Sequence, residues 1–108
     1  MKKVVLKDGT EILNCLDSTT SNEVIFIRPT YEEAGAVLNS VTPENAAIIK
    51  VYSDNETLLT QGTDLILLPN YILSQESDGV IASFRTRVKT AIEKMQDEIV
   101  ELQEAVIG

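Results

Sequence analysis

Short apolar runs separated by turn residues constrain the fold of this chain more than any other feature of its sequence. The runs Val4–Leu6 and Glu11–Leu16 flank an Asp8-Gly9 pair, and a second pair, Asp78-Gly79, precedes a further apolar run. Asp-Gly between two such runs is a strong hairpin signal, because both central residues of a type I′ turn need positive φ angles. The pattern therefore predicts short antiparallel strands that are joined by tight turns.

The rest of residues 1–84 divides into further strands, turns and a short helix. β-Branched and aromatic residues predict strands over 23–28, 47–52, 57–60, 65–73 and 80–84. Pro69, inside one of these runs, indicates an edge strand or a bend. Thr30 and Glu33 fit a capping box, so a helix is expected over residues 31–39. Pro43 follows Thr42 as at a helix start, but the strand that comes next leaves room for a single turn only.

Residues 85–108 are predicted to form one long helix, because neither Gly nor Pro occurs from Thr86 until Gly108. Its apolar residues are spaced alternately by four and three positions, which is typical of a coiled-coil seam. They are Val88, Ile92, Met95, Ile99, Leu102 and Val106. Branched residues at one seam position with Leu or Met at the other favour a two-stranded pair, so we expect a homo-oligomer that forms through this helix. The alternative is an amphipathic helix that lies on its own sheet.

Together these elements predict an α+β protein that forms a single structural unit. Residues 1–84 are expected to form a small antiparallel β-sheet domain, and residues 85–108 the long helix of a coiled-coil-like interface. A chain of 108 residues corresponds to one domain. Hydrophobic residues make up 44%, aromatic residues only 5%, and Trp is absent, so the core is expected to be aliphatic.

The charge balance argues against several classes of partner. Seventeen acidic and nine basic residues give a formal charge of −8. Such a surface repels the phosphate backbone of nucleic acids and anionic lipids, so neither general nucleic-acid binding nor membrane adhesion is expected. No run of 18 apolar residues is present and the first residues lack a signal-peptide core, so we expect a cytoplasmic location.

The residues that enzymes use are scarce in this sequence. It has no His, so Ser-His and Cys-His nucleophiles and imidazole metal sites are excluded. No carboxylate spacing resembles a calcium loop, and the five glycines are scattered rather than gathered in a phosphate loop. The single Cys15 lies in an alternating apolar stretch and is expected to be a small buried hydrophobe. We therefore predict a protein that is not an enzyme and that has neither a cofactor nor a metal site.

One charge arrangement offers a candidate ligand site. The predicted helix begins with Arg85, Arg87 and Lys89, whereas its second half is acidic. The helix dipole disfavours cations at this end, so three of them beside free N–H groups predict an electropositive corner suited to an anion or a phosphate. Phe84 is placed to stack on a base, and Arg28, at the end of another strand, joins the site if the fold brings it near.

The same cations also fit two arrangements that involve no ligand. An antiparallel partner helix would place its acidic end against the basic start and neutralise both. Alternatively, Arg85 and Arg87 flank a strand end in solvent and have no binding role.

Four segments, which together span most of the chain, resemble small proteins of phages and prophages of Gram-positive bacteria. They are the hairpin VVLKDGTEI, the strand and turn AAIIKVYSDNE, the strand DGVIASFRTR and the closing helix VKTAIEKMQDEIVELQEAVIG. Proteins of this kind include tail-associated accessory proteins, anti-CRISPRs and sponge proteins that sequester the cyclic nucleotide signals of Thoeris or related immunity. The layout is most similar to the Thoeris-inhibiting sponges, which are oligomers of a β-domain with C-terminal helices. This resemblance implies a phosphorylated nucleotide as ligand, held by Arg and aromatic residues.

Two functional hypotheses follow. In the first, the protein is a phage-encoded, non-enzymatic sponge that sequesters a small cyclic nucleotide immune signal. Its ligand-binding residues would be Phe84, Arg85, Arg87, Lys89 and Arg28. In the second, the protein is a phage tail accessory protein, or an inhibitor that blocks a host protein through its acidic surface.

Overall fold

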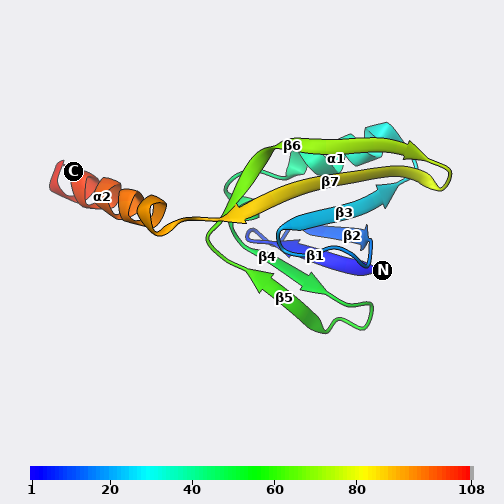
Figure 1. The fold of residues 1–108 in the computed structure, drawn as a ribbon, viewed down its shortest axis with the longest axis horizontal. Coiled ribbons are helices and arrows are strands. Elements are labelled where there is room, and N and C mark those ends of the chain that lie inside the picture. Colours follow the sequence, from blue (N-terminus) through cyan, green and yellow to red (C-terminus); the bar gives the residue numbers. More distant parts are fainter. Residues whose placement is uncertain (108) are drawn as a thin grey trace.

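The structure, a computed structural model, describes the backbone of residues 1–107 and the side chains of residues 1–99. In chain order its elements are β1 (Lys2–Leu6), β2 (Glu11–Cys15), β3 (Glu23–Arg28), α1 (Tyr31–Ser40), the 3₁₀ turn η1 (Asn45–Ala47), β4 (Ile49–Tyr52), β5 (Leu58–Gly62), β6 (Leu65–Glu76), β7 (Gly79–Val88) and α2 (Ala91–Ile107). The strands form one antiparallel sheet in the order β5-β4-β1-β2-β3-β7-β6 (Figure 1).

The sheet must curl, because the strands at its two edges follow each other in the chain. Seven flat strands would span about 29 Å from edge to edge. Only residues 63 and 64 join β5 to β6, and the three Cα–Cα steps from Gly62 to Leu65 reach about 11 Å at most. The two edges therefore approach each other at this corner, and the sheet wraps around its inward-facing side chains as an open barrel.

The core is the inward face of this curled sheet, closed by α1. Its buried side chains come from six of the strands and from α1: Val4, Leu6, Ile12, Cys15, Val24, Phe26, Ala34, Ile49, Val51, Leu65, Val80, Ala82 and Phe84. Helix α1 contacts β3, β7 and β6, and its Val37 and Leu38 pack against the core. It begins as predicted, because the Oγ1 atom of Thr30 accepts a hydrogen bond from the Glu33 N–H at 3.2 Å.

Both predicted hairpins form, but their turns are not of type I′. At the first, the Gly9 N–H donates to the Leu6 carbonyl at 3.0 Å and the Leu6 N–H donates to the Thr10 carbonyl at 2.9 Å. Only Gly9 has a positive φ, +89°, so this is a three-residue loop that ends in a left-handed glycine. At the second, Gly79 is the first residue of β7 and pairs with Glu76. Its φ is +136°, and an added Cβ would lie 2.7 Å from a backbone oxygen of β3, so only Gly fits.

The final strand differs from the prediction, because residues 85–88 continue β7 instead of opening a helix. Side chains alternate here between buried and exposed, as in a strand, with Phe84 and Thr86 inside and Arg85 and Arg87 outside. Thr86 is held by residues distant in sequence, since its Oγ1 donates to the Ser21 carbonyl at 2.7 Å. The absence of Gly and Pro, on which the helix prediction depended, does not distinguish a helix from a strand.

Helix α2 begins only at Ala91, after a capping box that the sequence analysis missed. The Glu93 N–H donates to Thr90 Oγ1 at 3.2 Å, and the Thr90 N–H donates to Glu93 Oε1 at 3.0 Å. Each residue thus satisfies a backbone N–H group of the first turn. The signal was present as Thr90-x-x-Glu93, but the helix start had been placed five to six residues too early.

The predicted α+β fold with a long coiled-coil helix is therefore wrong. The chain is mainly a seven-stranded antiparallel sheet, and two of its strands are long, with 12 residues in β6 and 10 in β7. Val88, the first predicted seam residue, belongs to β7, and the 17 residues of α2 are fewer than the three heptads, about 21 residues, that indicate a coiled coil. Leu102 and Val106 lie outside the described side chains.

The alternative of a helix that lies on its own sheet is not observed either. Helix α2 projects away from the sheet (Figure 1), and the exposed fractions of Ile92, Met95 and Ile99 are 68%, 59% and 52%. No helix in the described part of the chain is both long and apolar enough to cross a lipid bilayer.

Candidate functional site

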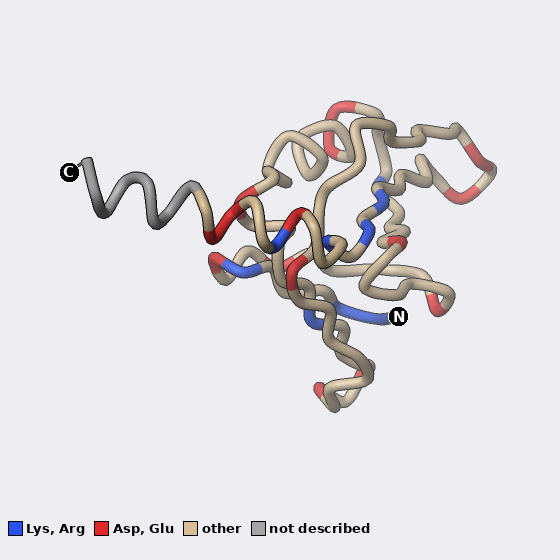
Figure 2. The backbone as a smooth tube through the Cα atoms, turned by 60° about the vertical axis from the view of Figure 1, so that its left-hand side comes forward, with Lys and Arg blue, Asp and Glu red and all other residues tan. Residues whose placement is uncertain are grey.

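Three of the five predicted ligand residues lie in a row where β7 leads into α2. Arg85 and Arg87 are two positions apart on the outward face of β7, and Lys89 follows directly after the strand. These three residues lie together because of the two-residue repeat of a strand, and not because a helix starts here. The helix-dipole argument therefore does not apply to this row. Figure 2 shows acidic residues next to basic ones in this part of the chain.

Each cation of this row forms an ion pair with a carboxylate. Arg85 Nε lies 2.9 Å from Glu23 Oε2, and Lys89 Nζ lies 2.7 Å from Asp97 Oδ2. Arg87 makes a bidentate contact with Glu93, at 2.7 and 3.0 Å. The predicted electropositive corner is therefore neutralised within the chain, by carboxylates of β3 and of α2 itself.

Of these ion pairs, Arg87–Glu93 has the largest effect on the pKa of its carboxyl group. The hydrogen bonds from Arg87, followed by that from the Thr90 N–H, lower the pKa of the Glu93 carboxyl to about 2. The same contact raises the pKa of Arg87. Both groups stay charged over the whole physiological range, so an incoming anion would have to displace a carboxylate that does not protonate.

Phe84 and Arg28, the other two predicted residues, do not join this row. Phe84 is 3% exposed and belongs to the core, so its ring is not available to stack on a ligand. Arg28 pairs with Val80 at one end of the β3–β7 ladder, whereas Arg85 pairs at the other, five residues or about 16 Å away. Its guanidinium donates to two main-chain carbonyls, at 2.8 and 2.7 Å.

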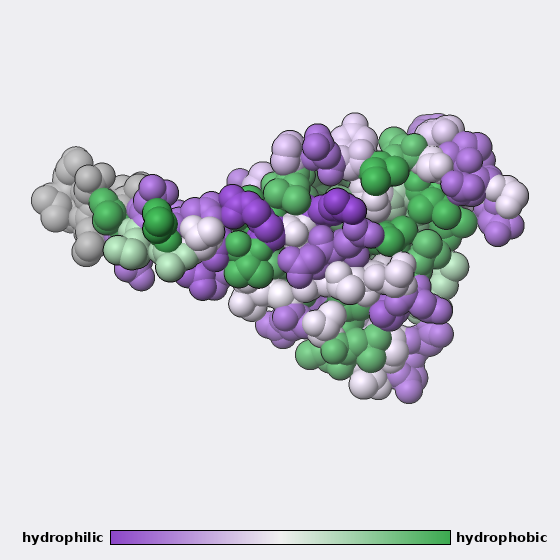
Figure 3. All heavy atoms as spheres, in the orientation of Figure 1, coloured by the Kyte–Doolittle hydropathy of each residue, from purple (hydrophilic) through white to green (hydrophobic). Residues whose placement is uncertain are grey.

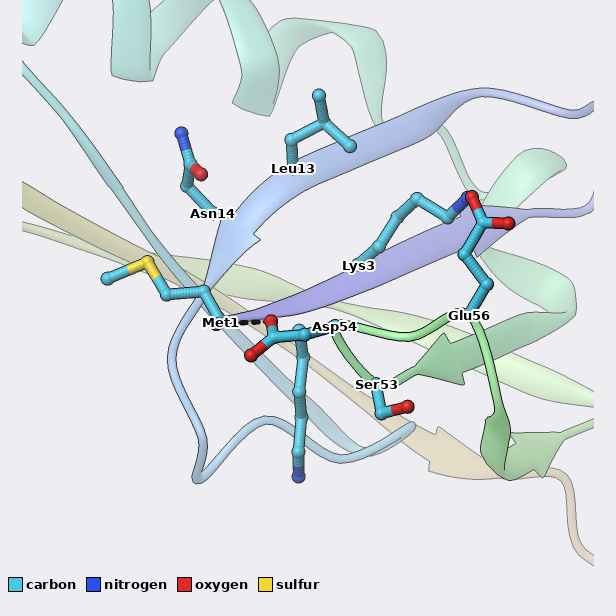
Figure 4. A pocket seen from close by; sticks show the side chains of 8 residues that line it. Met1, Lys3, Leu13, Asn14, Ser53, Asp54 and Glu56 are labelled. Atoms are coloured by element: carbon cyan, nitrogen blue, oxygen red, sulfur yellow. Dashed lines mark hydrogen bonds and ion pairs between the residues drawn. The ribbon is translucent and has the colours of Figure 1, made fainter.

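A hollow of about 430 Å³, here called the N-terminal hollow, lies on the outward face of β1 and β2 (Figure 4). A β-bulge shapes it: Val4 pairs with Ile12 but Lys2 pairs with Cys15, so β2 contains one extra residue. Asn14 supplies the positive φ, +58°, that this bulge requires. Leu13 and Asn14 consequently both point outward and line the hollow.

The charged groups around the N-terminal hollow are already matched to one another. The α-amino group of Met1 pairs with Asp54. Lys3 Nζ lies 3.4 Å from Glu11 and 3.6 Å from Glu56, and it also sits 5.5 Å from the centre of the Tyr52 ring. Lys2, which also lines the hollow, donates to the Thr19 carbonyl at 3.2 Å, so three positive groups lie near three carboxylates and the charges balance. Such exposed pairs stabilise the fold only slightly.

Helix α2 has an apolar face that does not pack on the sheet and stays exposed. Ile92, Met95 and Ile99 are three and four positions apart, so at about 100° per residue they lie on one face of the helix. Figure 3 shows hydrophobic side chains on this projecting helix. Residues 91–107 contain five acidic residues and one basic residue, so the apolar face belongs to an acidic helix.

Contacts with the β5–β6 link hold the start of α2 in place. The Lys89 N–H donates to the Asp64 carbonyl at 2.8 Å, and Lys94 Nζ lies 3.2 Å from Asp64 Oδ2. Asp64 has a positive φ of +53° at the sharp turn between the two edge strands. The helix is thus directed away from the sheet by its first turn. The apolar face remains in solvent as a result.

Among the described side chains, the single thiol and the possible metal ligands can be assessed directly. Cys15 is fully buried, as predicted, and burial raises the pKa of its thiol to about 11, so it is not a thiolate at neutral pH. No group of three His, Cys, Asp or Glu residues among the described side chains is placed to hold a metal ion.

The apolar face of α2 is therefore the candidate functional site, because its side chains are exposed, whereas the cations of the ion-pair row already have partners within the chain. The sequence analysis predicted Ile92, Met95 and Ile99 as residues of a coiled-coil interface, whereas the structure places them on a shorter helix that begins at Ala91. Comparisons with protein-family models, with curated proteins and with solved structures found no match to this chain.

Proposed function

We propose that this protein is a non-enzymatic protein-binding module, and that it binds by docking the acidic, amphipathic helix α2 onto an apolar groove with a basic border. The observation that supports the proposal is the exposure of Ile92, Met95 and Ile99 on a helix held away from its own sheet. Three large apolar side chains in one row, with no covering surface, are characteristic of an interaction site.

The size of the apolar face indicates how extensive the whole contact with the partner must be. Complete burial of one such side chain contributes about 1.5–3 kcal/mol relative to full exposure. These three are already partly covered, so their burial contributes less than the full amount. Association itself costs about 4–15 kcal/mol in lost translational and rotational freedom. The partner must therefore contact more of this protein than three side chains, either further along α2 or on the sheet.

The charge of α2 determines which surfaces it can bind. The helix carries five acidic residues and one basic residue, and the whole chain has a net charge of −8. This charge repels an acidic partner and accelerates association with a basic one. An apolar groove bordered by Lys or Arg fits both properties. A tail accessory protein and an inhibitor that blocks a host protein through its acidic surface would both act in this way.

Site-specific photo-crosslinking in the cells that naturally express the chain tests this proposal. The crosslinking residue p-benzoylphenylalanine replaces Ile92 in one variant and Asp97, on the opposite side of the helix, in the matched control. We expect one defined protein, a second copy of the chain included, to crosslink at position 92 and not at 97. The same crosslink should disappear with Ile99→Asp. Equal labelling at both positions, or labelling that survives Ile99→Asp, would overturn the proposal.

Capture of a small cyclic nucleotide is the second candidate function, and it would depend on Arg85, Arg87 and Lys89, the three cations that lie together where β7 leads into α2. A phosphate would have to replace the carboxylates of Glu23 and Glu93 as the partner of the two arginines. Charge-assisted hydrogen bonds of this kind contribute about 1.5–3 kcal/mol each. Loss of both arginines should therefore weaken binding by about two orders of magnitude or more.

Calorimetry with cyclic nucleotides, carried out on the parent protein and on the Arg85→Ala/Arg87→Ala double variant, tests the second candidate. Thermal unfolding of both proteins serves as the control for folding. Binding by the parent that the double variant loses supports nucleotide capture. Absence of binding by the parent, or equal binding by both proteins, contradicts it.

A further inference from the structure

The basic residues of this acidic protein are nearly all engaged within the described part of the chain. Five cations form ion pairs: Lys3, Arg85, Arg87, Lys89 and Lys94. Two more, Lys2 and Arg28, donate to main-chain carbonyls. Among the described side chains this leaves the ammonium groups of Lys7 and Lys50, which have neither a carboxylate nor a carbonyl partner.

Lys7 and Lys50 line the same hollow, here called the lysine hollow. Its volume is about 320 Å³, and its lining also includes Val5, Leu6, Gly9, Ile48 and Gln61. It lies on the outward face of the sheet, because Val5 pairs with Lys50 and Lys50 with Gln61, whereas the neighbouring Val4 and Val51 point into the core. The hollow thus combines an apolar floor with two free positive charges.

Hydrogen bonds around the buried side chain of Asn45 fix the loop that carries Lys7. The Lys7 N–H donates to the Asn45 carbonyl at 2.9 Å, and Asn45 Nδ2 donates to Asp8 Oδ2 at 3.2 Å and to the Ser40 carbonyl at 2.8 Å. The Asn45 side chain is buried and fully hydrogen-bonded. The loop is therefore ordered before anything binds, which lowers the conformational entropy that binding must offset.

We propose that the lysine hollow receives helix α2 of a second copy of this chain. The inference deepens the proposed function, on which it depends, by naming the partner surface. Val5 and Ile48 would contact the apolar face of α2, while Lys7 and Lys50 would lie beside acidic residues such as Glu98, which borders that face. The complementary charges allow two copies to associate at this place, although each carries a net charge of −8.

The helix of the same chain is not placed to occupy the lysine hollow. The contacts of Asp64 with Lys89 and Lys94 direct α2 away from the sheet. Exchange of helices between two copies uses both contacts at once, so that each copy gives one helix and receives the other. Two equal contacts then share a single loss of translational freedom, and the requirement for a contact larger than three side chains is met.

Charge reversal with rescue tests this arrangement, with the mass of the full chain measured by sedimentation velocity. We expect the parent to form a dimer that weakens at high salt, because exposed charges are screened at about 3 Å in 1 M salt. Lys7→Glu/Lys50→Glu and Glu98→Lys should each dissociate about tenfold or more readily, since each brings like charges together. Mixed in equal amounts, the two variants should form a heterodimer, because both of its contacts again join opposite charges.

In the matched control, the Glu76→Lys variant takes the place of the Glu98→Lys variant. It changes the net charge by the same amount, but at the β6–β7 turn. Because this variant keeps Lys7, Lys50 and Glu98, we expect it to dimerise with itself and to leave Lys7→Glu/Lys50→Glu monomeric when the two are mixed. Rescue by Glu76→Lys, self-association that survives Lys7→Glu/Lys50→Glu, or a parent that is monomeric at every concentration would each overturn the inference. The proposed function would stand in all three cases if the residue at position 92 still crosslinks to a different protein, so the two failures are distinguishable.

Discussion

The sheet body, residues 2–88, and helix α2 place the same kinds of side chain in opposite environments. Ile12, Ile49 and Phe26 of the body are almost completely buried, whereas Ile92, Met95 and Ile99 of α2 are more than half exposed. The body buries its core side chains by curling the sheet and closing it with α1, although some large apolar side chains, such as Leu59 and Ile72 of its edge strands, stay exposed. A lone helix has no comparable way to cover its own face. The body should therefore determine the stability of this protein, and α2 should determine what it binds.

The largest expected effect separates the two regions directly. Phe26→Ala should lower the free energy of unfolding of the body by about 3–5 kcal/mol, because it removes a fully buried ring and leaves a cavity. Ile92→Ala should leave this free energy unchanged, since its side chain is 68% exposed. Urea denaturation of dilute protein, followed by circular dichroism, measures both. A similar loss in the two variants would mean that α2 packs on the body in solution.

The two helix caps allow a finer comparison. Thr30 and Thr90 both accept a hydrogen bond from the N–H three residues ahead, each at 3.2 Å, so their replacement by Ala removes the same interaction. Each change should cost about 1 kcal/mol. For Thr30→Ala the loss should appear in global unfolding, because α1 packs on the core. For Thr90→Ala it should appear only as faster hydrogen exchange in the first turn of α2, and a lowered global stability would contradict this.

The smallest expected effect is the response of α2 to acid. The Arg87 guanidinium and the Thr90 N–H hold the pKa of Glu93 at about 2, below its ordinary value of 4.5. A depressed carboxyl pKa stabilises the folded helix start above pH 4.5, and this contribution is lost as the pH falls towards 2. Titration of the Glu93 carboxyl by NMR measures it, with Glu93→Gln as the control that removes the pH dependence. Titration near 4.5 would show that the Arg87 contact does not persist in solution.

The comparison also explains which sequence predictions succeeded. Each predicted strand overlaps an observed one. The bend predicted at Pro69 corresponds to a shift in the register between β6 and β7. These elements depend on alternation, turn residues and caps, which act over a few neighbouring positions. The end of β7 was mistaken for helix because its local signal is ambiguous, and the deciding contact joins Thr86 to Ser21, 65 positions away.

The ion pairs of the predicted ligand residues also depend on contacts between distant positions. The sequence places three cations together, and the structure keeps them together, but the partner of Arg85 is Glu23, 62 positions away. The sequence does not show that this carboxylate lies opposite Arg85 on the next strand. The lysine hollow was missed because Lys7 and Lys50 are far apart in the chain and meet only through the pairing of β1 with β4.

By itself the sequence determined the local structure of this protein: the hairpins, the helix caps, the aliphatic core residues and the apolar face of α2. The reason is that turn geometry, capping and periodic burial depend on residues within a few positions of one another. Only the tertiary structure decided where β7 ends, how the sheet curls and which charges remain free. Those outcomes depend on strand pairing, which joins distant residues, so a basic row became neutral and two isolated lysines came to line one hollow.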